Sequence, residues 1–303
     1  MSTPHIAFRC DASAVIGSGH VMRCLTLAKA LVDRGVRCSF LCRDLPGHMM
    51  TRIAAEGHGV HALAAPTGQG DAHTADGDYA AWLGVSPAAD AIESRAIMDM
   101  IRPDRVIVDH YALDADWEQA ACPGIPVMAI DDLANRPHSC DILLDQNLGR
   151  QASDYDGLVP ERALRLIGPS NALLRPEFAA ARAEALARRT ACSRVKALLI
   201  TMGGMDRENV TGQILQRLKQ ISLASDSVIR VVMGGHAPWL NFVEEVAAQM
   251  PCSVEVLVDV ADMAQLMVDS DLAIGATGST SWERCCLGLP CISVTIKPAT
   301  IFT

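Results

Sequence analysis

The feature that most constrains this chain is the regular alternation of short apolar runs with segments of helical periodicity. The runs are rich in Val, Ile and Leu and are bounded by glycine or charge, which is typical of buried strands. In segment 22–34, Leu25, Ala28 and Leu31 fall on one helical face, and Gly35 follows as a helix end. This alternation predicts parallel β-α-β units and an α/β fold. We expect strands at residues 5–8, 36–41, 106–108, 127–130, 197–201, 228–233, 254–257, 272–274 and 291–295.

The length of 303 residues suits two α/β domains of roughly 150 residues each. An Ala- and Arg-rich helix is predicted at 176–189, where a proline-punctuated segment separates the two runs of strands. We therefore expect domains at 1–175 and 176–303, two Rossmann-like halves that face a common cleft. Segment 66–77 has no periodicity and is predicted to be a long surface loop.

Composition excludes several classes of protein. A net charge of −9, with five Phe, four Trp and three Tyr, argues against a nucleic-acid surface. The eleven cysteines include no C-x-x-C pair, so we expect reduced core thiols. No apolar stretch is long enough to span a membrane, and the first residues lack the pattern of a secretory signal. We expect a cytoplasmic protein, monomeric, with no nucleic-acid partner and no membrane insertion.

The segment from Arg9 to His20 runs from a strand through a glycine-containing turn into a helix. Gly17 and Gly19 permit a tight turn and let backbone amides approach a ligand at the positive end of the helix. The sixth position of the G-S-G-H-V-M run is Met22, which departs from the dinucleotide fingerprint and disfavours NAD. The helix dipole opposes protonation of His20, so a neutral imidazole that acts as a general base is expected. The alternative is that His20 only caps the turn.

A second glycine-containing turn, at 275–278, also precedes a predicted helix. Backbone amides and hydroxyls at Gly278, Ser279 and Thr280 are suited to a diphosphate. Glu283 lies one helical turn after Ser279, where its carboxylate can accept hydrogen bonds from the two hydroxyls of a ribose. The alternative is simple helix capping by Ser and Thr.

Other polar residues follow the predicted strands. We expect Asp109, His110, Asp131 and Asp132 either to bind or orient a sugar or to cap loops. His138, Cys140 and Asp141 have the side chains of metal ligands, but no second pair stands at metal spacing, so a structural role is expected. The sequence thus predicts neither a metal nor a cofactor.

Several stretches in one order along the chain carry a family resemblance. The run 9–25, RCDASAVIGSGHVMRCL, strongly resembles the UDP-2,4-diacetamido-2,4,6-trideoxy-β-L-altropyranose hydrolases of pseudaminic acid biosynthesis. This family is similar to the peptidoglycan N-acetylglucosaminyltransferase. Further matching stretches are 108–111 (VDHY), 130–132 (IDD), 140–144 (CDILL), 153–155 (SDY), 174–178 (LRPEF) and 202–206 (MGGMD).

The resemblance implies a GT-B fold of two Rossmann-like domains, with UDP held mainly by the second. It implies that His20 deprotonates water for attack at the anomeric carbon, with cleavage of the C–O bond, inversion and release of UDP, and without a metal. It also implies that Glu283 holds the ribose. The residues expected to bind substrate or UDP are Arg9, Asp11, Gly17, Gly19, Tyr111, Gly203, Gly204, Gly278, Ser279, Thr280 and Glu283.

Three other functions stay open on the sequence. A GT-B glycosyltransferase with a UDP-amino-sugar donor needs the same base and the same nucleotide site. An epimerase of a UDP-sugar is a weaker alternative. A nucleotide-sugar-binding protein without turnover is the alternative outside the enzymes. The family usually continues after strand 291–295 with a polar Asn-Gln stretch and a helix, whereas here residues 296–303 differ, so a truncated or altered end is expected.

Overall fold

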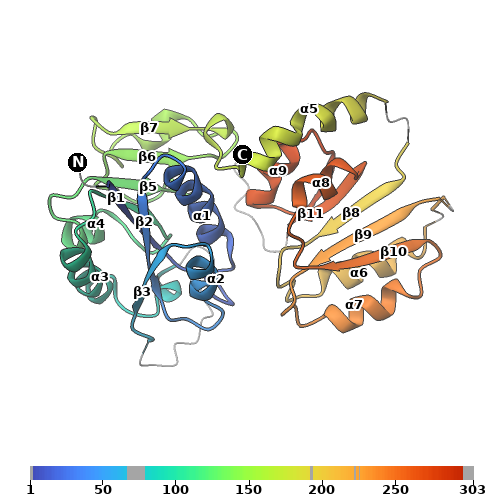
Figure 1. The fold of residues 1–303 in the computed structure, drawn as a ribbon, viewed down its shortest axis with the longest axis horizontal. Coiled ribbons are helices and arrows are strands. Elements are labelled where there is room, and N and C mark those ends of the chain that lie inside the picture. Colours follow the sequence, from blue (N-terminus) through green and yellow to red (C-terminus); the bar gives the residue numbers. More distant parts are fainter. Residues whose placement is uncertain (1–2, 67–78, 192–193, 222, 225, 296–303) are drawn as a thin grey trace. The chain divides into compact units, whose positions relative to one another are not determined.

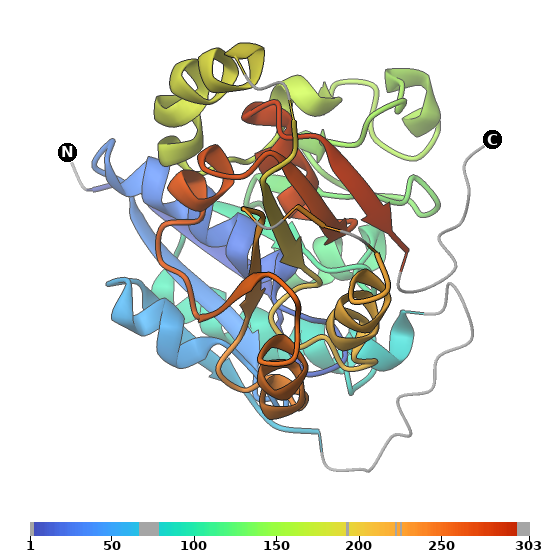
Figure 2. The same cartoon turned by 90° about the vertical axis from the view of Figure 1, so that its right-hand side faces the viewer.

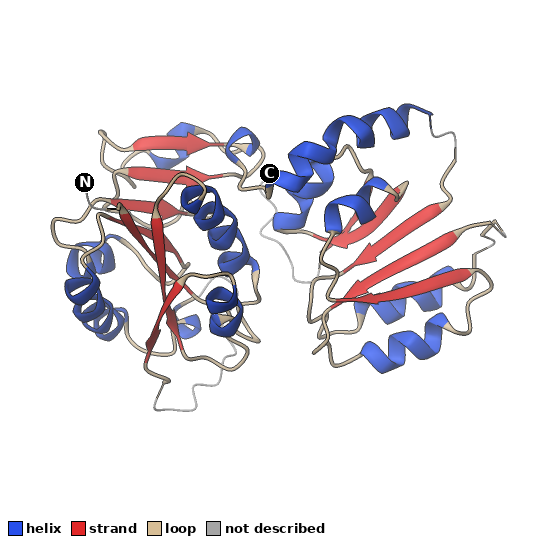
Figure 3. Ribbon diagram, in the orientation of Figure 1, coloured by secondary structure: helices blue, strands red, loops and turns tan. Residues whose placement is uncertain are grey.

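The computed structural model describes residues 3–66, 79–191, 194–221, 223–224 and 226–295. The chain divides into two compact units, Met1–Leu173 and Leu174–Thr303. Each unit is a parallel sheet with helices on both faces, as Figures 1 and 3 show. The α/β class predicted from the alternation of strands and helices is therefore confirmed for both halves.

The first unit contains a seven-stranded sheet in the order β3-β2-β1-β4-β5-β6-β7. Every strand pair in it is parallel, with β1 between β2 and β4. The strands are β1 (His5–Cys10), β2 (Arg37–Arg43), β3 (Gly59–Leu63), β4 (Arg105–Asp109), β5 (Val127–Ile130), β6 (Ile142–Asp145) and β7 (Leu164–Ile167).

Two hydrophobic clusters cover the two faces of the first sheet. One includes Val21 and Leu25 of α1 (Gly19–Val32) and Ile53 of α2 (Met50–Ala55). The other includes Met98 of α3 (Pro87–Ile101) and Trp117 of α4 (Ala115–Ala121). Apolar side chains therefore pack between the sheet and the helices on both faces, and the polar side chains of the candidate site lie at the ends of the strands. Short 3₁₀ turns are η1 (Ala80–Trp82), η2 (Ala152–Tyr155) and η3 (Pro169–Asn171).

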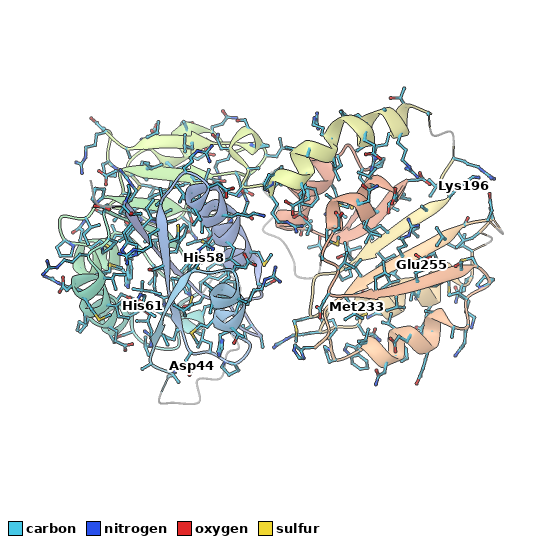
Figure 4. The ribbon with its side chains drawn as sticks, in the orientation of Figure 1. Asp44, His58, His61, Lys196, Met233 and Glu255 are labelled. Atoms are coloured by element: carbon cyan, nitrogen blue, oxygen red, sulfur yellow. The ribbon has the colours of Figure 1, made fainter. Side chains whose placement is uncertain are left out.

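The second unit repeats the topology with five parallel strands in the order β10-β9-β8-β11-β12. The strands are β8 (Ala197–Thr201), β9 (Val228–Met233), β10 (Ser253–Val258), β11 (Leu272–Ala276) and β12 (Cys291–Val294). In Figure 4 Lys196, which precedes β8, and Met233, which ends β9, mark opposite ends of this sheet. The carboxyl ends of the strands thus form one edge, as in the first unit.

Helices cover both faces of the second sheet as well, which Figure 2 shows from another side. Leu215 and Val243, from α6 (Val210–Leu218) and α7 (Leu240–Ala247), belong to one hydrophobic cluster. Phe178, Met267 and Leu287 belong to the other. They lie on or directly after α5 (Pro176–Ala191), α8 (Met263–Val268) and α9 (Ser279–Cys286).

All nine predicted strands are present; three have the predicted bounds, and the other six differ by one or two residues at one or both ends. The sequence did not predict β3 and β7, the two edge strands of the first sheet, or β6, which lies between β5 and β7. The predicted helix at 22–34 begins earlier, at Gly19, so that His20 is its second residue. The predicted loop at 66–77 and the altered end at 296–303 lie, except for Pro66, outside the described residues.

Candidate active site and nucleotide site

Polar side chains of the first unit gather where its strand order reverses direction, between β1 and β4. In doubly wound sheets the loops from such neighbouring strands leave in opposite directions, and ligands bind at their carboxyl ends. Asp109 ends β4 and pairs with Cys10 in register, while Asp132 follows β5. His20 reaches the same place from the start of α1, which follows β1.

His20 and Asp109 form a buried pair. The Nδ1 atom of His20 lies 2.5 Å from Oδ1 of Asp109, and the Asp109 side chain is 0% exposed. In the neutral tautomer in which Nδ1–H donates to the carboxylate, Nε2 is left as a proton acceptor. A carboxylate that fixes the imidazole in this way is the arrangement used by hydrolytic His–Asp bases.

Arg23, one helical turn after His20, bridges two carboxylates. Its Nε and Nη2 atoms donate to the two oxygens of Asp109, both at 2.6 Å, and Nη1 donates to Asp132 at 2.6 Å. Burial raises the pKa of Asp109, but Arg23 and His20 outweigh it and hold that pKa well below its ordinary value. Asp109 is therefore a carboxylate at any physiological pH.

Two aromatic rings pack against His20, and a third packs against both of them. The ring centroid of Tyr111 lies 4.6 Å from that of His20 in an edge-to-face arrangement, and that of Trp82 lies 6.2 Å away. Tyr79 packs against both Trp82 and Tyr111, at 4.7 and 4.9 Å. The Tyr111 hydroxyl donates to Asp132 at 2.6 Å, so this predicted substrate-binding residue is fixed beside the histidine. The rings give His20 an apolar surrounding with one ordered polar face.

A cavity of about 920 Å³ opens in the first unit beside Trp82. Its walls come from the loops that follow β1, β2 and β3 and from the turn before α3. Asp44 marks the end of β2 in Figure 4. The lining residues are 13–15, 44–48, 65–66, 80–82 and 84–85. Since Trp82 contacts both the cavity and His20, a ligand in this space can lie near the histidine.

Arg9 and Asp11, predicted to bind substrate, are both 0% exposed. Arg9 binds Asp11 at 2.7 Å and donates to Asp90 at 2.7 and 3.1 Å. Arg43 donates to the same Asp90 carboxylate at 2.7 Å. These charges neutralise one another inside the unit, where they hold β1, β2 and α3 together. Their role in substrate binding stays a prediction.

His110 and Asp131 also find their partners inside the unit. The Nδ1 atom of His110 accepts from the backbone of Ala112 at 3.1 Å, and burial lowers the pKa of His110 to about 4. Asp131 is bound by Arg136 at 2.7 Å and by the Tyr155 hydroxyl at 3.0 Å. These contacts favour the structural alternative for both residues.

His138, Cys140 and Asp141 make separate contacts. His138 binds Glu118 at 2.7 Å, and Asp141 accepts from the backbone of Val127 at 3.0 Å. Cys140 is buried in the hydrophobic core. In the part of the chain that the structure describes, no group of three or more His, Cys, Asp or Glu side chains is placed to hold a metal ion.

At the corresponding place in the second unit, the carboxyl ends of β8 and β11, glycines leave the backbone open. Gly203 and Gly204 follow β8, and Gly278 precedes α9. Gly203 has φ of 85° and Gly278 has φ of 149°, conformations that L-residues rarely adopt. A Cβ atom at any of the three would meet nothing within 4 Å, so the backbone here is open. The first turn of α9 supplies N–H groups without helical acceptors.

Glu283 of α9 is held by an arginine of its own unit. Nη2 of Arg175 donates to Oε1 of Glu283 at 3.2 Å, and the Glu283 side chain is 14% exposed. Burial raises the pKa of Glu283, although Arg175 opposes the shift. Thr280 Oγ1 accepts from Arg284 at 3.3 Å, and the side chain of Ser279 lies outside the described part of the chain. A raised carboxyl pKa at an open backbone edge is typical of functional sites.

Sequence reasoning missed Arg23, Tyr79 and Trp82 as members of the first site. Arg23 resembles any other residue of the helix in the sequence. Only its position three residues after His20 indicates that the two side chains lie on one helical face. Tyr79 and Trp82 follow a segment without periodicity, so the sequence does not indicate that their rings lie in this site. The sequence indicates Asp109 as a polar residue at the end of its strand, but its pairing with His20 depends on the strand order.

Two parallel, doubly wound Rossmann-like domains, each with a polar edge at its switch point, define the GT-B class of fold. Among solved structures, MurG of Acinetobacter baumannii superposes with a TM-score of 0.65 at 17% identity, covering 98% of this chain and 80% of that chain. A UDP-glucosyltransferase from Polygonum tinctorium gives 0.61 at 13% identity, with coverages of 98% and 81%. These likenesses confirm the predicted fold class.

Among curated proteins, the UDP-2,4-diacetamido-2,4,6-trideoxy-β-L-altropyranose hydrolase of Campylobacter jejuni is 28% identical, over 90% of this chain and 85% of its own length. The resemblance stated from the motifs is thus confirmed. An uncharacterised protein of Methanocaldococcus jannaschii is 25% identical, but the chain spans only 54% of its length. The spore coat polysaccharide biosynthesis protein SpsG of Bacillus subtilis is 29% identical over 41% of this chain. A comparison with protein-family models found no match.

Proposed function

We propose that this protein hydrolyses UDP-2,4-diacetamido-2,4,6-trideoxy-β-L-altropyranose and releases UDP, in pseudaminic acid biosynthesis. The observation that carries the proposal is the buried His20–Asp109 pair, with 2.5 Å between Nδ1 and Oδ1, at the switch point of the first unit. The identity to a curated hydrolase of this sugar nucleotide supports the choice of substrate. We further propose that the reaction takes place in the cytoplasm, in a monomer, without a metal or cofactor.

In the proposed reaction, Nε2 of His20 takes a proton from water as the water oxygen bonds to the anomeric carbon. The bond between that carbon and the diphosphate oxygen breaks, and its electron pair leaves with UDP. Because water attacks from the face opposite UDP, the configuration inverts. Asp109 stabilises the imidazolium that forms, in the same way as the carboxylate of a His–Asp base. Tyr111 and the turn at Gly17 and Gly19 are proposed to contact the sugar.

The second unit is proposed to bind UDP. The open backbone at Gly203, Gly204 and Gly278 can approach the diphosphate closely, and the first turn of α9, with Ser279 and Thr280, adds donors. Glu283 is proposed to accept hydrogen bonds from the ribose. Arg9 and Asp11, which are fully buried, would then act by fixing the end of β1 beneath the catalytic turn.

A glycosyltransferase with the same donor is the second candidate, and the cavity beside Trp82 favours it. A space of about 920 Å³ lined by Trp82, whose ring packs against His20, has room for an acceptor. In that reaction His20 would deprotonate an acceptor hydroxyl instead of water.

Incubation of the protein with the UDP-sugar, followed by chromatography of the products, tests the proposal. We expect UDP and the free diacetamido sugar in equal amounts, without any acceptor. Release of UDP only after addition of an acceptor alcohol would favour the transferase. UDP binding without any release would leave a nucleotide-sugar-binding protein and would contradict the hydrolase.

A further inference from the structure

We propose that Arg23 is a positioning residue that balances the charge of Asp109, so that this carboxylate orients His20 without keeping the ring protonated. The inference rests on the proposed role of His20 as a base. A base that already holds a proton cannot take one from water, so the charge around His20 decides whether it can work.

The geometry shows why Arg23 acts on Asp109 and not on substrate. The guanidinium donates twice to Asp109 and once to Asp132, each at 2.6 Å. Its side chain is 7% exposed, so these donors are directed into the unit. Arg23 thereby connects α1 with the ends of β4 and β5. A bidentate Arg–carboxylate contact fixes orientation as well as charge.

The charges that face the His20–Asp109 pair come from three elements. From α1 come Arg23, whose Nη2 lies 3.4 Å from His20 Nδ1, and the thiol of Cys24, which donates to Asp109 at 3.5 Å. His110, which interacts electrostatically with His20, and Tyr111 follow β4. Asp132 follows β5. With His20 neutral, this set holds two carboxylates and one guanidinium.

Loss of the Arg23 charge would remove the guanidinium that binds both Asp109 and Asp132 beside His20. A carboxylate within about 4–6 Å favours the charged form of a neighbouring base. The imidazolium would then gain stability relative to the neutral ring, so a larger share of the protein would lack a free base at a given pH. Lysine keeps the charge, but it lacks the planar fork that binds both oxygens of Asp109.

The experiment compares wild type with Arg23→Gln and Arg23→Lys in two measurements. The first is the NMR titration of the His20 ring in the protein without substrate. The second is kcat/KM against pH. In Arg23→Gln we expect both the titration midpoint and the acid limb of the profile to move upward by about one pH unit. In Arg23→Lys, which keeps the positive charge, the midpoint should lie close to that of wild type. Arg165→Gln, which removes an Arg–Asp pair of 2.6 Å on β7, is the control and should shift neither.

A second variant keeps the test decisive if Arg23→Gln does not fold. Asp132→Asn removes one of the two negative charges and should move the His20 midpoint to lower pH. An unmoved midpoint in folded Arg23→Gln, or an upward shift in Asp132→Asn, would overturn the proposal. The titration needs no turnover, so a shifted midpoint in a protein that does not hydrolyse the sugar would sink the proposed function and leave the role of Arg23 intact.

Discussion

The two units share one topology but use opposite chemistry at the same place in it. In the first unit, buried charged side chains lie at the carboxyl ends of β1 and β4, with Asp109 at 0% and Arg23 at 7% exposed. In the second unit, glycines with an open backbone lie at the carboxyl ends of β8 and β11. The same scaffold therefore offers a reactive group in one copy and a backbone cradle in the other.

This difference predicts where substitutions act. Charges buried together must satisfy one another, so a change in the first unit disturbs both the chemistry and the free energy of unfolding. Open backbone has few buried charges that need partners. A change in the second unit should therefore alter the affinity for UDP and leave the chemical step unchanged.

The largest effect is expected for His20→Asn, which removes the proposed base. Loss of a general base costs about 10²- to 10⁴-fold in kcat. UDP affinity should stay within about twofold of wild type, because the nucleotide is assigned to the other unit. Steady-state kinetics and calorimetric titration with UDP measure the two quantities. His61→Asn, on β3, is the control and should match wild type in both.

Asp109→Asn should lower kcat by about 10²-fold, because the amide no longer fixes the tautomer of His20. It should also lower the free energy of unfolding by about 3 kcal/mol, since Arg23 loses a buried partner. Urea unfolding and steady-state kinetics measure these effects. Asp131→Asn removes a comparably buried partner of Arg136, at 2.7 Å, and should destabilise the unit with a much smaller effect on kcat. Equal losses of kcat in both variants would count against the orienting role.

The first unit should lose stability on acidification because of His110. Burial lowers the pKa of His110 from 6.5 to about 4, so the unfolded chain takes up a proton that the folded unit does not. Stability from this group is complete above pH 6.5 and is lost as the pH falls toward 4, by up to about 3 kcal/mol. Urea unfolding at pH 7 and pH 4.5, followed by hydrogen exchange, assigns the loss to a unit. In His110→Asn the slope should be shallower, and an unchanged slope would reject the assignment.

The smallest effect is expected for Glu283→Ala, which should weaken UDP binding about tenfold, the worth of a charge-assisted hydrogen bond. kcat at saturating substrate should stay close to wild type. Glu177→Ala is a matched control, because Glu177 binds the same Arg175 at 3.1 Å. If both variants bind UDP as wild type does, the ribose role of Glu283 is wrong.

The sequence predicts where strands and helices lie along the chain better than it predicts which strands are adjacent in the sheet. The strands at 127–130, 197–201 and 228–233 were predicted with the bounds the structure has, since each is an uninterrupted apolar run. β3 and β7 were missed because edge strands are only partly buried and carry mixed residues such as His61 and Arg165.

The same limit applies to the site. His20 was predicted from its position between a glycine turn and a helix, which is local information. Its pairing with Asp109, 89 residues along the chain, follows from the neighbouring places of β1 and β4 in the sheet. No local pattern states that order, so Arg23 and Trp82 were not recognised as members of the site.

The most direct test of the account is a single turnover in water enriched in ¹⁸O, followed by mass spectrometry of both products. Attack of water on the anomeric carbon puts the label into the free sugar and leaves UDP unlabelled. We expect that result in wild type, and no labelled sugar from His20→Asn over the same time. Label in the terminal phosphate of UDP would mean that water attacks phosphorus, and it would contradict the chemistry assigned to His20.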